Sequence, residues 1–174
     1  MSTKLTYALG LTVVSAVLSL LLYFTGYQTE KLAAGQSIQQ WLGFALMVGT
    51  LWLGIRAVRD ERGPKGLSYG GALGTGVLIS LYSGLMSSVY SYVHFKFINT
   101  EFFDYQMALV REGWAKAGMS GAQMEQAEAM ASKFMGPGIT AAFTTPIVVI
   151  IGLIVSLILA AFLKRAATES EPSA

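Results

Sequence analysis

The sequence predicts an all-α, polytopic membrane protein with four transmembrane helices and a helical amphipathic insertion between the third and the fourth. Hydrophobic residues make up 53% of the 174 residues and charged residues only 13%, against about 25% in a typical soluble domain. The charges are also segregated, which leaves apolar runs near the ~20 residues that cross a hydrocarbon layer. The length fits one domain, so we interpret 1–174 as a single membrane domain.

The first two spans are predicted over 5–24 and 38–58, joined by a polar connection over 28–37. Only Lys4 precedes the first apolar run, so a signal peptide is an alternative interpretation. The run is longer than a usual signal-peptide core, and the small residues at 33–35 directly follow Glu30 and Lys31. We therefore expect a retained span.

A basic, turn-rich loop over 56–66 separates the second span from the third. Its cations are Arg56, Arg59, Arg62 and Lys65. Short basic loops stay on the cytoplasmic side of a membrane, so we interpret these four side chains as topology markers. Contact with lipid headgroups or with a regulatory partner is the alternative.

The third span, predicted over 68–95, carries small residues at every fourth position. Gly76, Ser80, Gly84 and Ser88 therefore lie on nearly one face of the helix. Small side chains let helix backbones approach closely, and in lipid such contact has to hold helices together. We favour a helix-packing seam, either within the monomer or between protomers.

Polar side chains on the same span support a second interpretation, a polar cleft that forms a solute path. Its candidate lining residues are Ser80, Tyr82, Ser87 and Tyr90, and His94 follows at the end of the span. His94 can serve as a proton-responsive group. Beside its aromatic neighbours, however, we expect it to anchor the helix at the membrane interface.

The insertion over 99–138 has the pattern of two helices that carry too many charges to cross a membrane. We expect Asn99 or Thr100 to cap the first helix, and Ser120 with Gln123 to form a capping box for the second. These helices lie in the interface plane or fold back over the ends of the spans.

The fourth span is predicted over 139–163, with a kink at Pro146 because proline cannot donate to the carbonyl one turn back. The Leu/Ile/Val-rich run over 147–159 is expected to face lipid. A polar tail over 168–174 is expected to be disordered.

Four stretches, taken in their order and spacing, resemble a bacterial membrane-protein family known as domain of unknown function 4199, over nearly the whole chain. After Ile98 the sequence reads Asn-Thr-Glu-Phe, where that family often has Asp-Pro. The resemblance implies a four-span membrane protein of the bacterial cytoplasmic (inner) membrane, with no established activity. The stretches are 66–76 after the basic loop, 85–92 (LMSSVYSY), 118–120 with the acidic helix after it, and 156–164 (SLILAAFLK).

Three classes of function compete. The first is a non-enzymatic interaction or accessory protein, with a homo-oligomer or another membrane protein as its partner through the third span. The alternative is a small transporter or channel for a neutral solute, because the spans carry no internal charges to mark an ion pathway. An intramembrane enzyme is the least supported, since no paired carboxylates or nucleophile–base pair stand in the spans.

The composition also argues against several partners. A formal net charge of +2 is too small to indicate a nucleic-acid partner. The chain has no cysteine and a single histidine, which excludes disulfides and thiolate metal sites. We therefore expect no metal, no cofactor, and the lipid bilayer as the main surrounding.

The orientation follows from the positive charges. Four spans place both termini and the loop 56–66 on one side, together with seven of the twelve lysines and arginines. The other five are spread over many more residues on the insertion side. We expect both termini to be cytoplasmic.

A reporter fused after Gly118 tests this orientation. Alkaline phosphatase, which folds only outside the cytoplasm, should be active in this fusion, and a fluorescent protein that matures in the cytoplasm should be dark. The reverse pattern would invert the topology.

Overall fold

The structure, a computed structural model, describes residues 1–166. The predicted tail over 168–174 lies outside these residues. Within 1–166 the chain is helical, without a strand, and four of its helices are long and apolar enough to cross a membrane. This confirms the predicted fold class. The six α-helices are α1 (Thr3–Phe24), α2 (Leu32–Arg62), α3 (Tyr69–Val93), α4 (Phe102–Lys116), α5 (Gly121–Ala131) and α6 (Pro137–Leu163).

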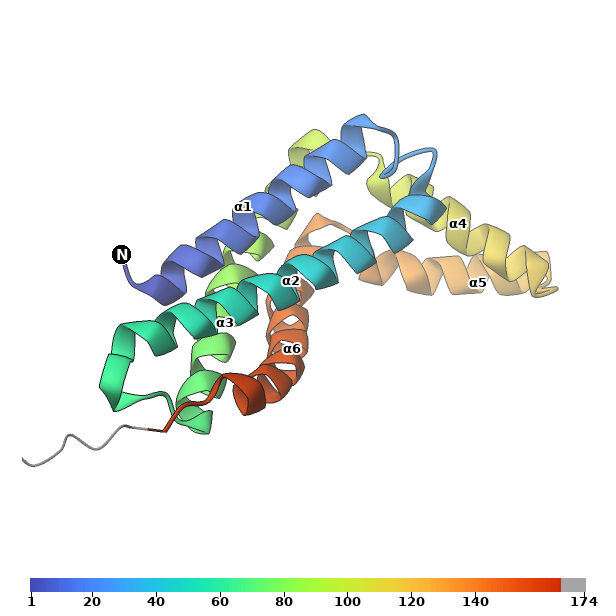
Figure 1. Cartoon of the computed structure of the whole chain (residues 1–174). Helices are drawn as coiled ribbons and strands as arrows, with labels where there is room; N and C mark the ends of the chain where they lie inside the picture. The colour runs from blue at the N-terminus through green and yellow to red at the C-terminus, as the bar shows by residue number, and fades with distance from the viewer. Residues whose placement is uncertain (167–174) are drawn as a thin grey trace, which may run out of the picture.

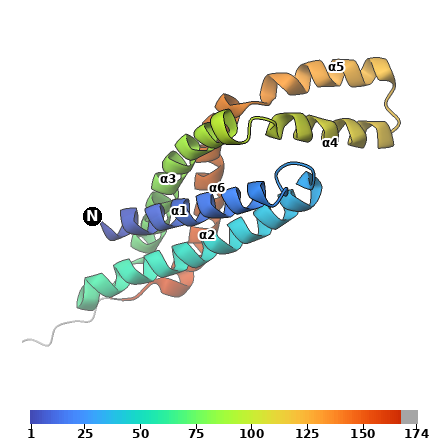
Figure 2. The ribbon, with the colours of Figure 1, turned by 90° about the horizontal axis from the view of Figure 1, so that it is seen from above.

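The four long helices form two antiparallel pairs that cross one another (Figures 1 and 2). One pair is α1 with α2, and the other is α3 with α6. The N-terminus, the α2–α3 loop and the last turn of α6 lie at one end, which we call the loop end. The α1–α2 turn and the shorter helices α4 and α5 lie at the opposite end, the hairpin end, where α4 and α5 project sideways (Figure 2).

The observed bounds differ most from the expected ones in α2. This helix starts at Leu32 and not near 38, so most of the expected polar connection is helical. Gly35 permits the early start, because a Cβ there would lie 2.6 Å from the carbonyl carbon of Tyr27. At the other end α2 runs on to Arg62 through the basic segment.

The small residues of α3 lie against α6. A Cβ on Gly76 would approach Ser156 Cβ to 2.8 Å, and one on Gly84 would approach Thr145 Cα to 3.2 Å. Further along the same face, the Ser88 hydroxyl donates to the Ala141 carbonyl. We call this contact the α3–α6 seam. It lies inside the monomer.

The α6 side of the seam corrects an expectation. The run over 147–159 does not simply face lipid, because Gly152 and Ser156 are buried in the seam. A side chain on Gly152 would overlap Ser80, so the two helices interlock through alternating glycine and serine. The neighbouring Ile150 and Ile154 remain exposed, as expected for a lipid-facing surface.

The interior at the loop end is apolar and closely filled. Leu51 and Ile55 of α2 and Ile79 of α3 are fully buried there. Beyond this core, the backbone groups of Leu67 and Arg165 exchange hydrogen bonds of 2.9 and 2.8 Å. Two short segments that are distant in sequence are thereby joined at the loop end.

The predicted topology markers lie at this loop end. Arg56 and Arg59 of α2 pair with Asp60, at 3.7 Å and 3.0 Å between the charged atoms. Arg62 is exposed at the end of α2, and Lys65 is exposed in the 3₁₀ turn that follows, Gly63–Lys65. All four cations therefore stand beside one another on a solvated surface.

At the hairpin end, α4 and α5 form a helical hairpin. The predicted capping box of Ser120 and Gln123 is confirmed. The predicted cap of α4 is wrong, because its N-cap is Glu101 without a side-chain bond. Arg111 binds Glu128 across the hairpin, and this bond holds the pKa of the Glu128 carboxyl below its usual range.

The α3–α6 seam predicts that a larger side chain on α3 destabilises the protein and that a smaller one opposite it on α6 restores the stability. Gly76→Ala should destabilise the protein by about 1–3 kcal/mol, the usual cost of overpacking, because its Cβ overlaps Ser156. Adding Ser156→Gly removes the overlapping side chain and should restore most of the lost stability. Thermal unfolding in a mild detergent measures both changes.

Gly74→Ala is the matched control, because Gly74 lies on α3 with no atom within 4 Å of its added Cβ. It should leave the unfolding temperature unchanged or slightly raised. Equal unfolding temperatures for the Gly76→Ala and Gly74→Ala variants would contradict the seam.

Candidate functional site

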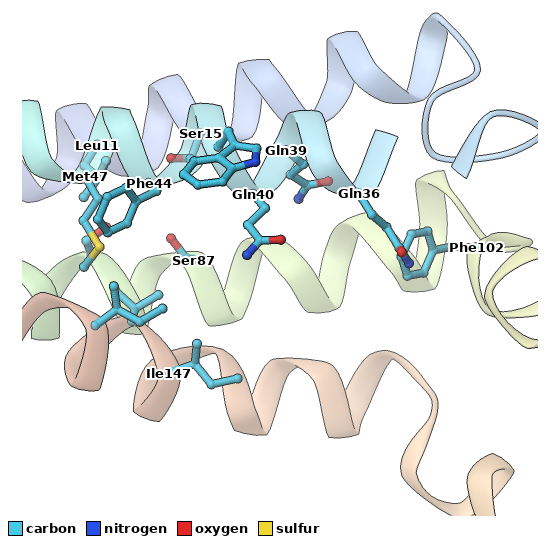
Figure 3. Close-up of a pocket in the computed structure, with 15 residues that line it drawn as sticks. Leu11, Ser15, Gln36, Gln39, Gln40, Phe44, Met47, Ser87, Phe102 and Ile147 are labelled. Atoms are coloured by element: carbon cyan, nitrogen blue, oxygen red, sulfur yellow. The ribbon is translucent and has the colours of Figure 1, made fainter. Parts of the chain in front are cut away.

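A lateral cleft of about 760 Å³ lies between the first half of α2 and the pair α3 and α6 (Figure 3). α1 contributes to the wall beside α2, and Phe102 of α4 stands at the hairpin end. The cleft exists because α2 stands off from α3 and α6 here, while the core closes the loop end. Its lining residues are Leu11, Ser15, Gln36, Gln39, Gln40, Trp41, Gly43, Phe44, Met47, Ser83, Ser87, Phe102, Ile147, Val148 and Ile151.

Polarity changes along the depth of this cleft. Gln36, Gln39 and Gln40 line it near the start of α2, whereas Phe44 and Met47 line it deeper. At about 1.5 Å per residue, the step from the first glutamine to the methionine covers about 17 Å. The cleft therefore has a mouth toward the hairpin end where three carboxamides stand beside Trp41 and Phe102, and a mainly apolar floor. Figure 3 shows the Gln40 carboxamide extending from α2 into the space between α2 and α3, to one side of Ser87.

A smaller cavity of about 120 Å³ adjoins the cleft between α1 and α3. We call it the side chamber. It shares Ser15, Gln39 and Ser87 with the cleft, so the two spaces meet along these three residues. The remaining lining residues of the chamber are Thr12, Ala16, Ser19, Tyr90, Ser91, His94 and Phe95.

Several polar groups that face these cavities make no hydrogen bond within residues 1–166. The hydroxyls of Ser15, Ser87 and Ser91 have no partner, nor has the amide nitrogen of Gln39. The three serines are half-buried and Gln39 is exposed, so water can reach these groups. These groups are therefore free to bind water or a polar part of a ligand.

Behind the side chamber lies a buried polar cluster formed by Gln28, His94 and Asn99. Their exposed fractions are 1%, 0% and 1%. His94 begins a single π-helical turn, His94–Ile98, that ends α3. The turn brings the Asn99 amide to the His94 carbonyl, at 2.8 Å. Gln28, in the α1–α2 turn, is thereby held against the end of α3.

The contacts within this cluster determine which atom of each pair donates the hydrogen and which accepts it. Asn99 Nδ2 lies 3.3 Å from the Gln28 backbone oxygen, which only accepts, and so it is a donor. The same nitrogen lies 3.4 Å from Gln28 Oε1, which therefore accepts. His94 Nε2, at 2.8 Å from that oxygen, must then donate. In the neutral imidazole Nδ1 is then an acceptor, and it shares the single hydrogen of the Tyr90 hydroxyl, 3.2 Å away, with the Ala16 carbonyl at 3.1 Å.

The cluster also reaches α1 and α2. Gln28 Nε2 donates to Ser19 Oγ at 2.9 Å and to Gln39 Oε1 at 3.2 Å. The Tyr90 hydroxyl lies 3.1 Å from the Ala16 carbonyl of α1. One glutamine thus connects three helices, and it fixes Gln39 at the boundary between chamber and cleft.

The residues that the sequence predicts to line a polar cleft lie in different places in the structure. Ser87, Tyr90 and His94 line the side chamber. Tyr82 instead packs against the apolar core, and Ser80 is buried in the α3–α6 seam. His94 is not an interface anchor, because its side chain is fully buried behind the chamber.

The residues that sequence reasoning missed come mainly from α2 and the turn before it. Gln36, Gln39 and Gln40 were assigned to a loop and the edge of a span. Their spacing of three and one residues places them near one another on a helix, so the sequence does contain a signal that they lie together. Nothing in the sequence indicated that Gln28 is buried against His94.

These features define an all-helical integral membrane protein with a cleft open to its side. A family model described as "Protein of unknown function (DUF4199)" matches residues 6–165. The chain therefore belongs to this family, which confirms the resemblance seen in the sequence. No curated protein and no solved structure matches the chain.

The buried cluster predicts a strong effect of Gln28→Leu. This change leaves His94 Nε2 without its partner and removes the Asn99 contact to Gln28 Oε1. Each buried group without a partner costs about 1–3 kcal/mol. The midpoint of thermal unfolding in detergent should fall by several degrees.

Gln36→Leu is the matched control, because Gln36 is exposed on α2 and its side chain makes no hydrogen bond within residues 1–166. Its unfolding midpoint should stay close to the wild-type value. A Gln28→Leu protein as stable as this control would show that the cluster does not hold the α1–α2 turn.

Proposed function

We propose that this protein is a non-enzymatic accessory membrane protein that binds an uncharged amphiphile in its lateral cleft. The observation that carries the proposal is the polarity of the cleft, with carboxamides at the mouth and apolar side chains on the floor. An amphiphile has the same division between a hydrogen-bonding head and an apolar tail. A ligand of this kind satisfies both halves of the cleft at once.

The lining chemistry supports an uncharged ligand. Among residues 1–166, no lysine, arginine, aspartate or glutamate lines the cleft or the side chamber. Moving an ionised group from water into such a site without a partner is costly. Carboxamides and hydroxyls instead offer donors and acceptors that suit neutral polar groups.

The position of the cleft supports entry from the bilayer. Trp41, Phe44 and Ile147 line the cleft and are exposed by 71%, 46% and 52%. Such apolar side chains are stable in contact with lipid tails. A ligand tail can therefore pass from the bilayer to the floor without crossing water.

The localisation that we propose is the bacterial cytoplasmic membrane, with both termini in the cytoplasm. The excess of lysine and arginine at the loop end supports this orientation. The mouth of the cleft then faces the extracytoplasmic leaflet. A second copy or another membrane protein would have to use a face other than the α3–α6 seam, because α6 already covers Gly84.

The alternative is a small transporter or channel for a neutral solute. The hydroxyls of Ser15, Ser87 and Ser91, which make no hydrogen bond within residues 1–166, favour it, because they place polar groups along the side chamber. Such a path needs a second opening at the loop end, where Leu51 and Ile55 fill the interior. We therefore favour binding, and flux of glycerol into proteoliposomes would reverse that preference.

Trp41 provides a direct test of ligand binding. A variant with Trp52→Phe and Trp114→Phe keeps Trp41 as its one tryptophan. In phosphatidylcholine nanodiscs, a 9,10-dibromostearoyl monoglyceride should quench Trp41 fluorescence saturably at low mole fraction, because bromine quenches a nearby indole. Quenching that only rises in proportion to the probe would indicate contact with bulk lipid.

Gly43→Leu, in the same single-tryptophan background, should abolish the saturable part. Gly43 lines the cleft with no atom within 4 Å of its added Cβ, so a leucine there fills the cleft without a clash at its Cβ. Gly49→Leu is the control, because Gly49 is exposed on the same helix and does not line the cleft. Equal quenching of the two variants would refute binding in the cleft.

A further inference from the structure

We infer that the side chamber is a headgroup site that selects amphiphiles with a small, uncharged, hydroxyl-bearing head of about the size of glycerol. The inference rests on the proposed function, because the tail of the ligand has to occupy the cleft. It adds the chemical class of the head, which the cleft alone does not define.

The size of the chamber sets the first limit. Its volume of about 120 Å³ is small beside the 760 Å³ of the cleft. A small head such as glycerol therefore suits the chamber, while the larger cleft suits the tail. The chamber meets the cleft at Ser15, Gln39 and Ser87, so a head in the chamber is continuous with a tail in the cleft.

The free hydrogen-bonding groups set the second limit. Within residues 1–166, the hydroxyls of Ser15, Ser87 and Ser91 make no hydrogen bond, and neither does Gln39 Nε2. A serine hydroxyl both donates and accepts. Vicinal hydroxyls on a ligand have the same dual character, so they can pair with several of these groups at once. A ketone or an ester offers acceptors only and leaves the serine oxygens without donors.

The electrostatics set the third limit. Tyr90 and His94 are the titratable groups that line the chamber, and the assigned hydrogen bonds already use the ring nitrogens of His94. In the described part of the chain, no lysine or arginine side chain lines the space to neutralise a phosphate. An anionic phospholipid head would therefore be desolvated without a counter-charge, which is unfavourable.

The buried cluster holds the chamber in shape. Gln28 fixes Gln39 at one side through a 3.2 Å hydrogen bond and His94 at the back through a 2.8 Å hydrogen bond. Both contacts precede any ligand, so Gln39 and His94 stand in position before binding. Preorganised polar groups lose little entropy on binding, and this increases selectivity for a matching head.

Three brominated probes with the same acyl chain test the inference on the single-tryptophan protein. They are the monoglyceride, the methyl ester and the phosphatidylglycerol. The monoglyceride should bind at least about tenfold more tightly than the methyl ester, which lacks hydroxyls, because one or two hydrogen bonds are lost. It should also bind more tightly than the anionic phosphatidylglycerol.

Ser91→Met fills the chamber without entering the cleft, since Ser91 lines only the chamber. It should weaken the monoglyceride by about tenfold and leave the methyl ester unchanged. Ser91→Ala, which removes one hydroxyl and adds no bulk, should weaken the monoglyceride by a few fold. Val93→Met is the control, because Val93 is exposed on the same helix and lies outside both cavities.

The outcomes separate the two proposals. If all three probes bind equally and Gly43→Leu still abolishes quenching, the cleft binds tails while water alone fills the chamber, and the headgroup inference is overturned. A preference for phosphatidylglycerol overturns it as well. If no probe quenches saturably, the proposed function fails and the headgroup site fails with it.

Discussion

Close contact between α3 and α6 is the constraint on which the rest of the molecule depends. In lipid, apolar surface alone does not bring helices together, so backbones have to approach closely enough for dispersion to act. Gly76 opposite Ser156, and Ser80 opposite Gly152, provide this approach through alternating small side chains. The seam turns two helices that are distant in the sequence into one central unit.

The cleft is a consequence of this arrangement. α3 contacts both α6 and α1, and at the loop end Leu51 and Ile79 also bring α2 into contact with it. Toward the hairpin end α2 carries glutamines where a close-packed helix would carry small or apolar residues. The helix therefore stands away from α3 and α6 there, and the space between them has a polar mouth and an apolar floor.

The His94 cluster compensates for the looser packing at that end. Gln28 binds His94, Ser19 and Gln39, and so it ties the α1–α2 turn to the end of α3. A buried polar cluster contributes stability only if its members satisfy one another. Here the π-helical turn after Val93 brings Asn99 back against Gln28, which pairs the Asn99 side-chain nitrogen, while the Asn99 side-chain oxygen stays buried without a partner among residues 1–166.

The sequence by itself determined the all-helical class, the four long apolar helices and the small-residue face of α3, because hydrophobic length and four-residue spacing are local properties of the chain. It also gave the capping box at Ser120. The tertiary structure decided which partner covers Gly84, that His94 is buried, and that Asn99 joins a cluster in place of capping a helix. It also brought Gln39 and Ser87 to one boundary, because α2 and α3 meet only after the chain has turned back on itself. A small or polar side chain in the sequence indicates that close contact or a hydrogen bond is needed at that position. Which residue provides the contact depends on how helices that are distant in the sequence pack together.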